Sequence, residues 1–170
     1  DLDIVLVDSE LAFGNEKLLP AGPLREGKEA FNRIDKLVVV NKSTDSKRAE
    51  KYAHIMSKKL NCKTAICSTT PDYIYNILSG ERIAAGEAVT AICAIGQPEQ
   101  FFRFVENRFE VIRKIAYDDH HVYKQSELDA IKGTIVTTEK DAVKMSNFNR
   151  KDIYAMKLKI DLDIKTLLED

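Results

Sequence analysis

Short apolar runs alternate with helical patterns along the chain, which is typical of an α/β fold. Three runs, Ile4–Val7, Leu37–Val40 and Thr64–Cys67, are short and rich in β-branched residues. Such runs suit strands that are buried on both faces, as in a parallel sheet. Residues 46–60 place apolar side chains at helical spacing with Lys and Glu between them. The first 67 residues therefore predict an alternation of strands and helices around a parallel sheet.

The second half of the chain predicts a further small α/β lobe. Residues 73–85 contain two short apolar stretches around the turn Ser79–Arg82, and they predict a β hairpin, or two ribbon strands, that link two lobes. We therefore expect a first α/β part over residues 1–69, a β linker over 70–87 and a second α/β lobe over 88–170. In that lobe we expect strands at Val89–Ile95, Val111–Tyr117, Thr134–Thr137 and Ile153–Ile160, and helices that begin at Pro98, Ser126 and Thr138.

Charge and composition narrow the class of protein. The chain of 170 residues has 26 Lys+Arg against 27 Asp+Glu and a net charge of −1, which argues against broad nucleic-acid binding. Its three cysteines lack metal-ligand spacing and predict reduced thiols in a cytosolic fold. The chain begins at Asp1 without Met, and an apolar run follows almost at once, so we expect it to be a piece of a larger protein.

Polar clusters follow several of the predicted strands. They comprise Asp8, Asn41, Gly96, Asp118–His121 and Thr137–Asp141. Ligands in open α/β sheets bind beyond the carboxyl ends of the strands, so these clusters are the candidate site.

Two features of the first third resemble parts of a nucleotide site. Gly22–Glu29 nearly matches a phosphate-binding P-loop, but Glu29 stands where the pattern needs Ser or Thr, and Pro23 removes a backbone donor. We therefore interpret this stretch as a Gly/Pro loop. Asp8 ends an apolar strand, as does the aspartate that helps to hold magnesium in P-loop enzymes, but it can equally order the following loop.

Asp118–His121 is the densest chemical cluster. Histidine can transfer a proton near neutral pH or bind a metal, and a neighbouring carboxylate can set its tautomer. A surface turn of solvated charges, or a metal site for hydrolysis, are the alternatives. Lys140 at another strand end could contact an anionic ligand.

Four blocks in a fixed order resemble one family, tetraacyldisaccharide 4'-kinase, the lipid A 4'-kinase of Gram-negative bacteria. They are Phe13–Asn15 with Leu18–Glu26, Ile95-Gly96 with Pro98 and Phe101-Phe102, Asp119-His120 with Tyr123, and Thr138–Lys144. Together they run from residue 13 to residue 144.

The resemblance implies a P-loop-type α/β kinase whose second α/β lobe is joined by a two-stranded β linker. Such an enzyme transfers the γ-phosphate of ATP, with Mg²⁺, to the 4'-hydroxyl of an acylated glucosamine disaccharide 1-phosphate. It works as a peripheral protein at the cytoplasmic face of the bacterial inner membrane.

The same resemblance implies roles for individual residues. His120, with Asp119 beside it, corresponds to the histidine that partners a catalytic carboxylate. Arg25 and Glu26 correspond to residues near the nucleotide, and Glu26 also to one near the metal.

The family's P-loop and its early acidic blocks lie upstream of the stretch that this chain resembles. The chain therefore resembles the C-terminal half of the kinase, and we expect it to need the N-terminal half as a partner and to be inactive alone. The alternative from another class is a non-catalytic α/β module that binds a nucleotide or phospho-sugar.

Overall fold

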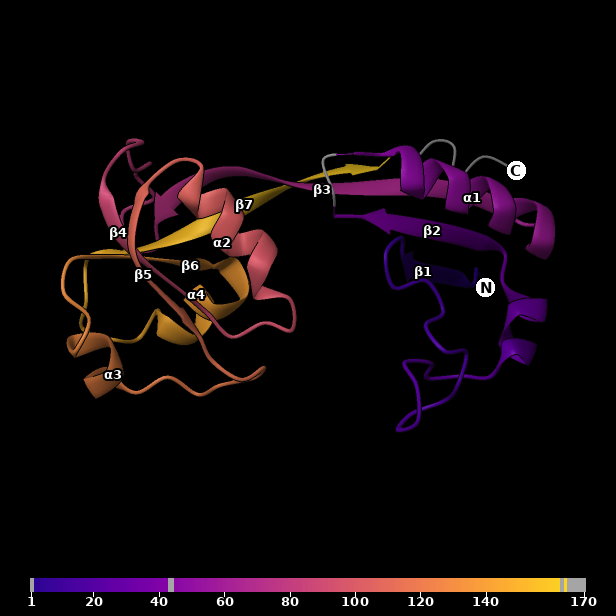
Figure 1. The fold of residues 1–170 in the computed structure, drawn as a ribbon, viewed down its shortest axis with the longest axis horizontal. Coiled ribbons are helices and arrows are strands. Elements are labelled where there is room, and N and C mark those ends of the chain that lie inside the picture. Colours follow the sequence, from indigo (N-terminus) through magenta and orange to yellow (C-terminus); the bar gives the residue numbers. More distant parts are fainter. Residues whose placement is uncertain (1, 43–44, 163, 165–170) are drawn as a thin grey trace. The chain divides into compact units, whose positions relative to one another are not determined.

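The chain forms two compact units in a computed structural model that describes residues 2–42, 45–162 and 164 (Figure 1). Unit 1 comprises the residues up to Thr70 together with those from Lys159 onward, and unit 2 comprises Pro71–Leu158. The predicted division into residues 1–69, 70–87 and 88–170 stays a prediction. The last strand continues past Leu158, and its residues from Lys159 to Leu162 belong with unit 1.

Unit 1 is built on parallel strands. They are β1 (Ile4–Asp8), β2 (Lys36–Asn41) and the first part of β3 (Lys63–Asn76). In the register of β1 and β2, Val7 lies opposite Val39. The predicted parallel α/β arrangement of the first third is therefore confirmed.

Helix α1 (Lys47–Leu60) covers one face of this sheet (Figure 1). It ends at Asn61, whose φ of 48° is the left-handed conformation that often terminates helices. A 3-10 helix, η1 (Lys28–Arg33), precedes β2. The core between α1 and the sheet is formed by Val7, Leu37, Val39, Ala49, Ala53 and Met56.

Strand β1 is not buried on both faces, contrary to the prediction from its apolar run. Val7 is 6% exposed, but Leu6 is 66% and Ile4 39% exposed. Alternate side chains of a strand point to opposite faces, and only the face with Val5 and Val7 packs against α1. Strand β2 lies between β1 and β3 and is buried along nearly its whole length, as predicted.

Strand β3 is longer than predicted. The predicted strand ends at Cys67 and the predicted hairpin begins at residue 73, whereas β3 runs without interruption through the β-branched Thr69 and Thr70, which favour extended backbone. Short antiparallel pairing corresponds to the predicted hairpin: Tyr75 and Arg82 form a bridge, and the Asn76 amide donates to the Glu81 carbonyl (2.8 Å) and the Ile83 amide to the Ile74 carbonyl (3.2 Å).

Strand β7 (Ile153–Leu162) is the neighbour of β3 in the strand order. Both strands contain residues of unit 1 and of unit 2. The pairing of β3 with β7 joins segments that are distant in the sequence, so a local pattern could not predict it. The role of residues 70–87 as a β linker stays a prediction.

The strands form one seven-stranded sheet in the order β1-β2-β3-β7-β6-β4-β5, and unit 2 contains the part of it from β3 to β5. The pairs β4–β5, β4–β6 and β6–β7 are parallel. Its further elements are β4 (Ala88–Cys93), α2 (Pro98–Glu106), β5 (Glu110–Ala116), α3 (Gln125–Asp129), β6 (Thr134–Thr138) and α4 (Glu139–Met145).

Helices cover both faces of the unit 2 sheet. Phe101 of α2 packs in one cluster with Val136, whereas Leu128 of α3 and Met145 of α4 pack in another with Ile135. Neighbouring side chains of β6 thus face different helices. The connections after β4 and β6 therefore leave toward opposite faces, and such a switch point is where open α/β sheets bind ligands.

The described part of the chain contains no helix that is long and apolar enough to cross a membrane. Cys62, Cys67 and Cys93 are not joined by disulfides in the described structure.

Leu37 and Leu6 of unit 1 differ strongly in burial, and this difference predicts different effects of their replacement. Leu37 is fully buried, so Leu37→Ala should cost about 2–5 kcal/mol of unfolding free energy through lost burial and an unfilled cavity. Leu6→Ala on the neighbouring strand should stay within about 0.5 kcal/mol. Hydrogen exchange of the β2 amides measures both variants in the 170-residue chain. Equal costs at the two positions would contradict the core described here.

Candidate functional site

Asp8 at the carboxyl end of β1 orders the loop that follows it. Its carboxylate accepts hydrogen bonds from the backbone amides of Glu10 (2.8 Å) and Leu11 (3.2 Å) and pairs with the Lys42 ammonium at 2.8 Å. Burial acts to raise the pKa of Asp8, but Lys42 and the two amides outweigh it, so the pKa lies below its usual value. Of the two predicted roles, these contacts support the ordering of the loop.

The glycine-proline stretch after residue 14 is folded on itself rather than open for a phosphate. The Gly22 amide donates to the Leu18 carbonyl (3.0 Å) and the Leu24 amide to the Lys17 carbonyl (3.1 Å). A Cβ at Gly22 would lie 2.4 Å from the Lys17 carbonyl oxygen, so close backbone approach requires glycine here. The interpretation as a Gly/Pro loop agrees with this geometry.

Glu26 lies near the amino ends of the unit 1 strands. The Arg33 guanidinium donates to the Glu26 carboxylate and also lies 3.6 Å from the carboxylate of Asp3, which directly precedes β1. Asp8, in contrast, is the last residue of β1 and lies at the carboxyl ends of the strands. The Arg25 side chain is exposed and makes no hydrogen bond or ion pair with other described residues. Nucleotide or metal contact by Arg25 and Glu26 stays a prediction.

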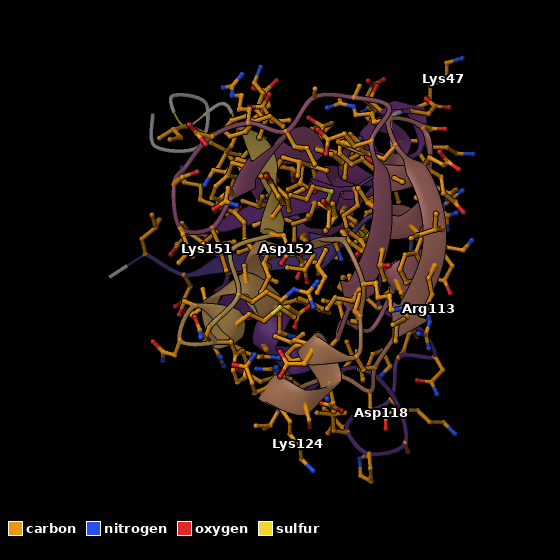
Figure 2. All side chains as sticks on the ribbon, turned by 90° about the vertical axis from the view of Figure 1, so that its left-hand side faces the viewer. Lys47, Arg113, Asp118, Lys124, Lys151 and Asp152 are labelled. Carbon is orange, nitrogen blue, oxygen red and sulfur yellow. The ribbon has the colours of Figure 1, made fainter. Side chains whose placement is uncertain are left out.

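In unit 2, the segment after β5 folds into a tight turn. The His121 amide donates to the Asp118 carbonyl (3.1 Å), and His120 has a φ of 66°. This left-handed conformation costs an L-residue roughly 1–2 kcal/mol, so surrounding contacts must hold it. Asp118 and Lys124, which flank the segment, are exposed at the surface (Figure 2).

Three polar side chains meet at this turn. The Lys140 ammonium donates to the Asp119 carboxylate at 2.7 Å, and the His120 Nε2 atom lies 3.6 Å from the same carboxylate. Lys140 is the main cause that lowers the pKa of Asp119, so this side chain stays anionic beside the imidazole. The predicted pair Asp119 and His120 is thus joined by Lys140, and the His120 side chain is 81% exposed.

His121 turns the opposite way and has a structural environment. Its ring stacks on Tyr117 with centroids 4.3 Å apart and contacts Tyr123 edge-on at 5.0 Å. Its Nε2 atom lies 3.2 Å from the Glu127 carboxylate. Only His120 of the two adjacent histidines is therefore largely exposed to solvent.

Asp141 is the polar residue of this region whose burial sequence reasoning missed. Its side chain is fully buried and accepts hydrogen bonds from the Ala94 amide (2.9 Å) and the Thr138 hydroxyl (2.8 Å), with the Lys144 ammonium 3.1 Å away. The Asp141 amide in turn donates to Thr138, which caps α4. The spacing Thr138-x-x-Asp141 is a capping signal that was visible in the sequence, but burial against β4 was not.

The candidate residues do not form a ready metal site. No group of three or more His, Cys, Asp or Glu side chains within the described ranges could hold a metal ion. A surface hollow of about 430 Å³ in unit 2 is lined by α2 and β5 and contains none of the predicted site residues. The candidate site of unit 2 is therefore the Asp119, His120 and Lys140 cluster beside the β4 and β6 ends.

Sequence comparison finds kinase relatives along the whole chain. Residues 1–170 match the family described as Tetraacyldisaccharide-1-P 4'-kinase. The tetraacyldisaccharide 4'-kinase of Francisella tularensis subsp. novicida (strain U112) is 31% identical over 173 residues, which cover 96% of this chain and 51% of the relative. The protein of the same name from Francisella tularensis subsp. tularensis (strain WY96-3418) is 30% identical over the same shares.

Structure comparison supports the same fold. The crystal structure of the "apo" form of LpxK from Aquifex aeolicus in complex with ATP superposes with a TM-score of 0.59 at 21% sequence identity. The superposition covers 98% of this chain and 50% of that chain. This chain thus spans about half the length of the proteins that it matches.

The lowered pKa of Asp8 makes a prediction about pH. A carboxylate with a lowered pKa stabilises the fold fully above its unfolded pKa of about 4, and this contribution disappears as the pH falls through the lower folded pKa. Asp8→Asn should therefore cost about 1 kcal/mol at pH 7, and the difference from the parent should shrink as the pH falls below about 4. Urea unfolding at pH 7, 5 and 3 measures it.

Glu10→Gln is the matched control, because the exposed Glu10 side chain belongs to the same loop. It should show little effect at any of these pH values. A cost of Asp8→Asn that is the same at pH 7, 5 and 3 would contradict the role assigned to the charge of Asp8.

Proposed function

Because the chain belongs to the tetraacyldisaccharide-1-P 4'-kinase family, we propose that it is the C-terminal part of a lipid A 4'-kinase. The complete enzyme transfers the γ-phosphate of ATP to the 4'-hydroxyl of tetraacyldisaccharide 1-phosphate. The observation that carries this proposal is the family match over all 170 residues. The Asp119, His120 and Lys140 cluster beside the carboxyl ends of the unit 2 strands supports it.

His120 is the residue of this chain that we assign to the chemistry. Its imidazole is exposed, and its Nε2 atom lies 3.6 Å from the Asp119 carboxylate. In this role His120 orients a carboxylate of the N-terminal half, which accepts the proton of the 4'-hydroxyl. Arg25, which is exposed and has no partner among the described residues, neutralises charge on the γ-phosphate.

ATP and Mg²⁺ are proposed for the complete enzyme rather than for this segment alone. The Gly22 and Leu24 amides are already bonded within their loop, so they do not offer a phosphate cradle. The Glu26 carboxylate is paired with Arg33, and no group of three suitable ligands occurs among the described residues. The residues present therefore do not form a complete magnesium site, and we assign no catalytic step to the ion.

The exposed side of β1 supports a partner segment for this chain. Parallel sheets are usually covered on both faces, and edge strands rarely present apolar side chains to water. Leu6 and Ile4 of β1 are nevertheless 66% and 39% exposed. We propose that the N-terminal half of the kinase covers these two side chains.

We further propose that the complete enzyme acts at the cytoplasmic face of the inner membrane as a peripheral protein.

Assays on the 170-residue chain distinguish the kinase proposal from the alternative, a non-catalytic binding module. Our proposal expects no ATP turnover and weak ATP binding at best. Tight ATP binding, with a Kd below about 10 µM, would favour the binding module.

The test of the chemistry is His120→Ala in the complete kinase, measured as phosphate transfer from ATP to tetraacyldisaccharide 1-phosphate. General acid–base partners contribute roughly 10²–10⁴-fold, so kcat should fall at least about a hundredfold. His54→Ala is the matched control, because His54 is an exposed histidine of α1. A His120→Ala enzyme that works within a few-fold of the parent would remove His120 from the mechanism.

A further inference from the structure

The buried carboxylate of Asp141 has no part in the reaction proposed above, yet its burial costs free energy that other contacts must compensate. Burying an ionised carboxylate is unfavourable unless hydrogen bonds and a countercharge compensate. Asp141 has two donors at its Oδ2 atom, the Ala94 amide and the Thr138 hydroxyl, and the Lys144 ammonium at Oδ1. Its partners therefore come from the end of β4, the end of β6 and helix α4.

Lys144 connects this buried carboxylate to the candidate site. Its ammonium also donates to the backbone carbonyl of His121 at 3.2 Å and lies 5.7 Å from the centroid of the Tyr123 ring. The Lys144 side chain is 28% exposed, so these contacts are largely shielded from water. A charge-assisted hydrogen bond in such surroundings is stronger than one at an open surface.

Two lysines of α4 hold the residues on either side of His120. Lys140 and Lys144 are four residues apart, so their side chains lie on the same face of the helix. Lys140 binds the Asp119 carboxylate at 2.7 Å, and Lys144 binds the His121 carbonyl. His120 lies between these two tethers in the left-handed conformation that the surrounding contacts must maintain.

We propose that Asp141 and Lys144 are positioning residues for His120. The buried carboxylate holds the Lys144 ammonium in place, and Lys144 in turn holds the His121 carbonyl and thereby the turn that presents the imidazole of His120. The pair does not touch the reacting atoms. This inference rests on the proposed function for its catalytic consequence, but the anchoring of the turn itself does not depend on it.

Kinetic measurements can distinguish a positioning role of Lys144 from a role in stability alone. If Lys144 only stabilised unit 2, its removal would lower stability and leave the turnover of the folded enzyme unchanged. If it positions His120, kcat must fall while substrate binding stays nearly the same. A conservative replacement that retains the charge and the donors must then restore most of the rate.

The test uses Lys144→Met, which keeps the apolar stem and removes the ammonium. In the complete kinase we expect kcat to fall about tenfold or more, with the KM for ATP within about twofold of the parent. Lys144→Arg should keep at least half of the parental kcat. In the 170-residue chain, Lys144→Met should speed amide exchange of residues 120–123 about tenfold and leave the β2 amides unchanged.

Lys132→Met is the matched control, because Lys132 is an exposed lysine of unit 2 and its side chain has no partner among the described residues. It should change neither kcat nor exchange at the turn. The double variant Asp141→Asn with Lys144→Met should lose no more kcat than the more impaired single variant, since both residues act through one contact chain.

Two results would overturn the proposal: an unchanged kcat in Lys144→Met, or exchange at the turn no faster than in Lys132→Met. If the parental complete protein fails to phosphorylate the disaccharide, the proposed function is wrong. The exchange measurement on the 170-residue chain then still decides whether Lys144 anchors the turn.

Discussion

The arrangement of the candidate site in unit 2 depends on one buried negative charge. Asp141 has no contact with water, so its carboxylate must be satisfied within the protein. It achieves this with a backbone amide at the end of β4, a hydroxyl at the end of β6 and the Lys144 ammonium. Three segments that are separate in the sequence are thereby held together at the edge of the sheet where ligands bind in such folds.

The neighbouring residues of α4 extend this role to other parts of unit 2. Glu139 accepts hydrogen bonds from the Tyr75 hydroxyl (3.1 Å) and the Lys157 ammonium (2.9 Å), so the start of the helix is tied to β3 and β7. Lys140 is tied to Asp119 after β5. The motif Thr138–Lys144, which contributes to the family resemblance, therefore works in this structure as a set of contacts that organises the strand ends.

Unit 1 distributes its charged residues differently. Asp8 and Lys42 lie where β1 and β2 end, whereas Glu26 and Arg33 lie with Asp3 where the strands begin. The loop after β1 thus leads from the carboxyl ends of the strands back to their amino ends. Glu26 is exposed and its carboxylate pairs with Arg33 through one oxygen, so it belongs to a different ion pair from the Asp119 and Lys140 pair beside His120.

Much of the secondary structure was determined by the local sequence. The β-branched runs at Ile4–Val7 and Leu37–Val40 and the spacing in residues 46–60 suffice for β1, β2 and α1, because strand and helix periods follow from neighbouring residues. The pairing of Asp119 with His120 was also predictable, since the two residues are adjacent in the chain. The family resemblance likewise came from short motifs and is shown by the match over residues 1–170.

Only the tertiary structure decided which polar residues are buried and which strands are neighbours. The contact between Ala94 and Asp141 joins residues 47 positions apart, and Lys140 reaches Asp119 across 21. The exposure of Leu6 and the pairing of β3 with β7 likewise depend on which element packs against each face. A local pattern carries the period of a strand or helix but not the identity of its distant partner. For that reason His120 could be named as a candidate from the sequence, whereas the contacts of Lys140 and Lys144 with its neighbours could not.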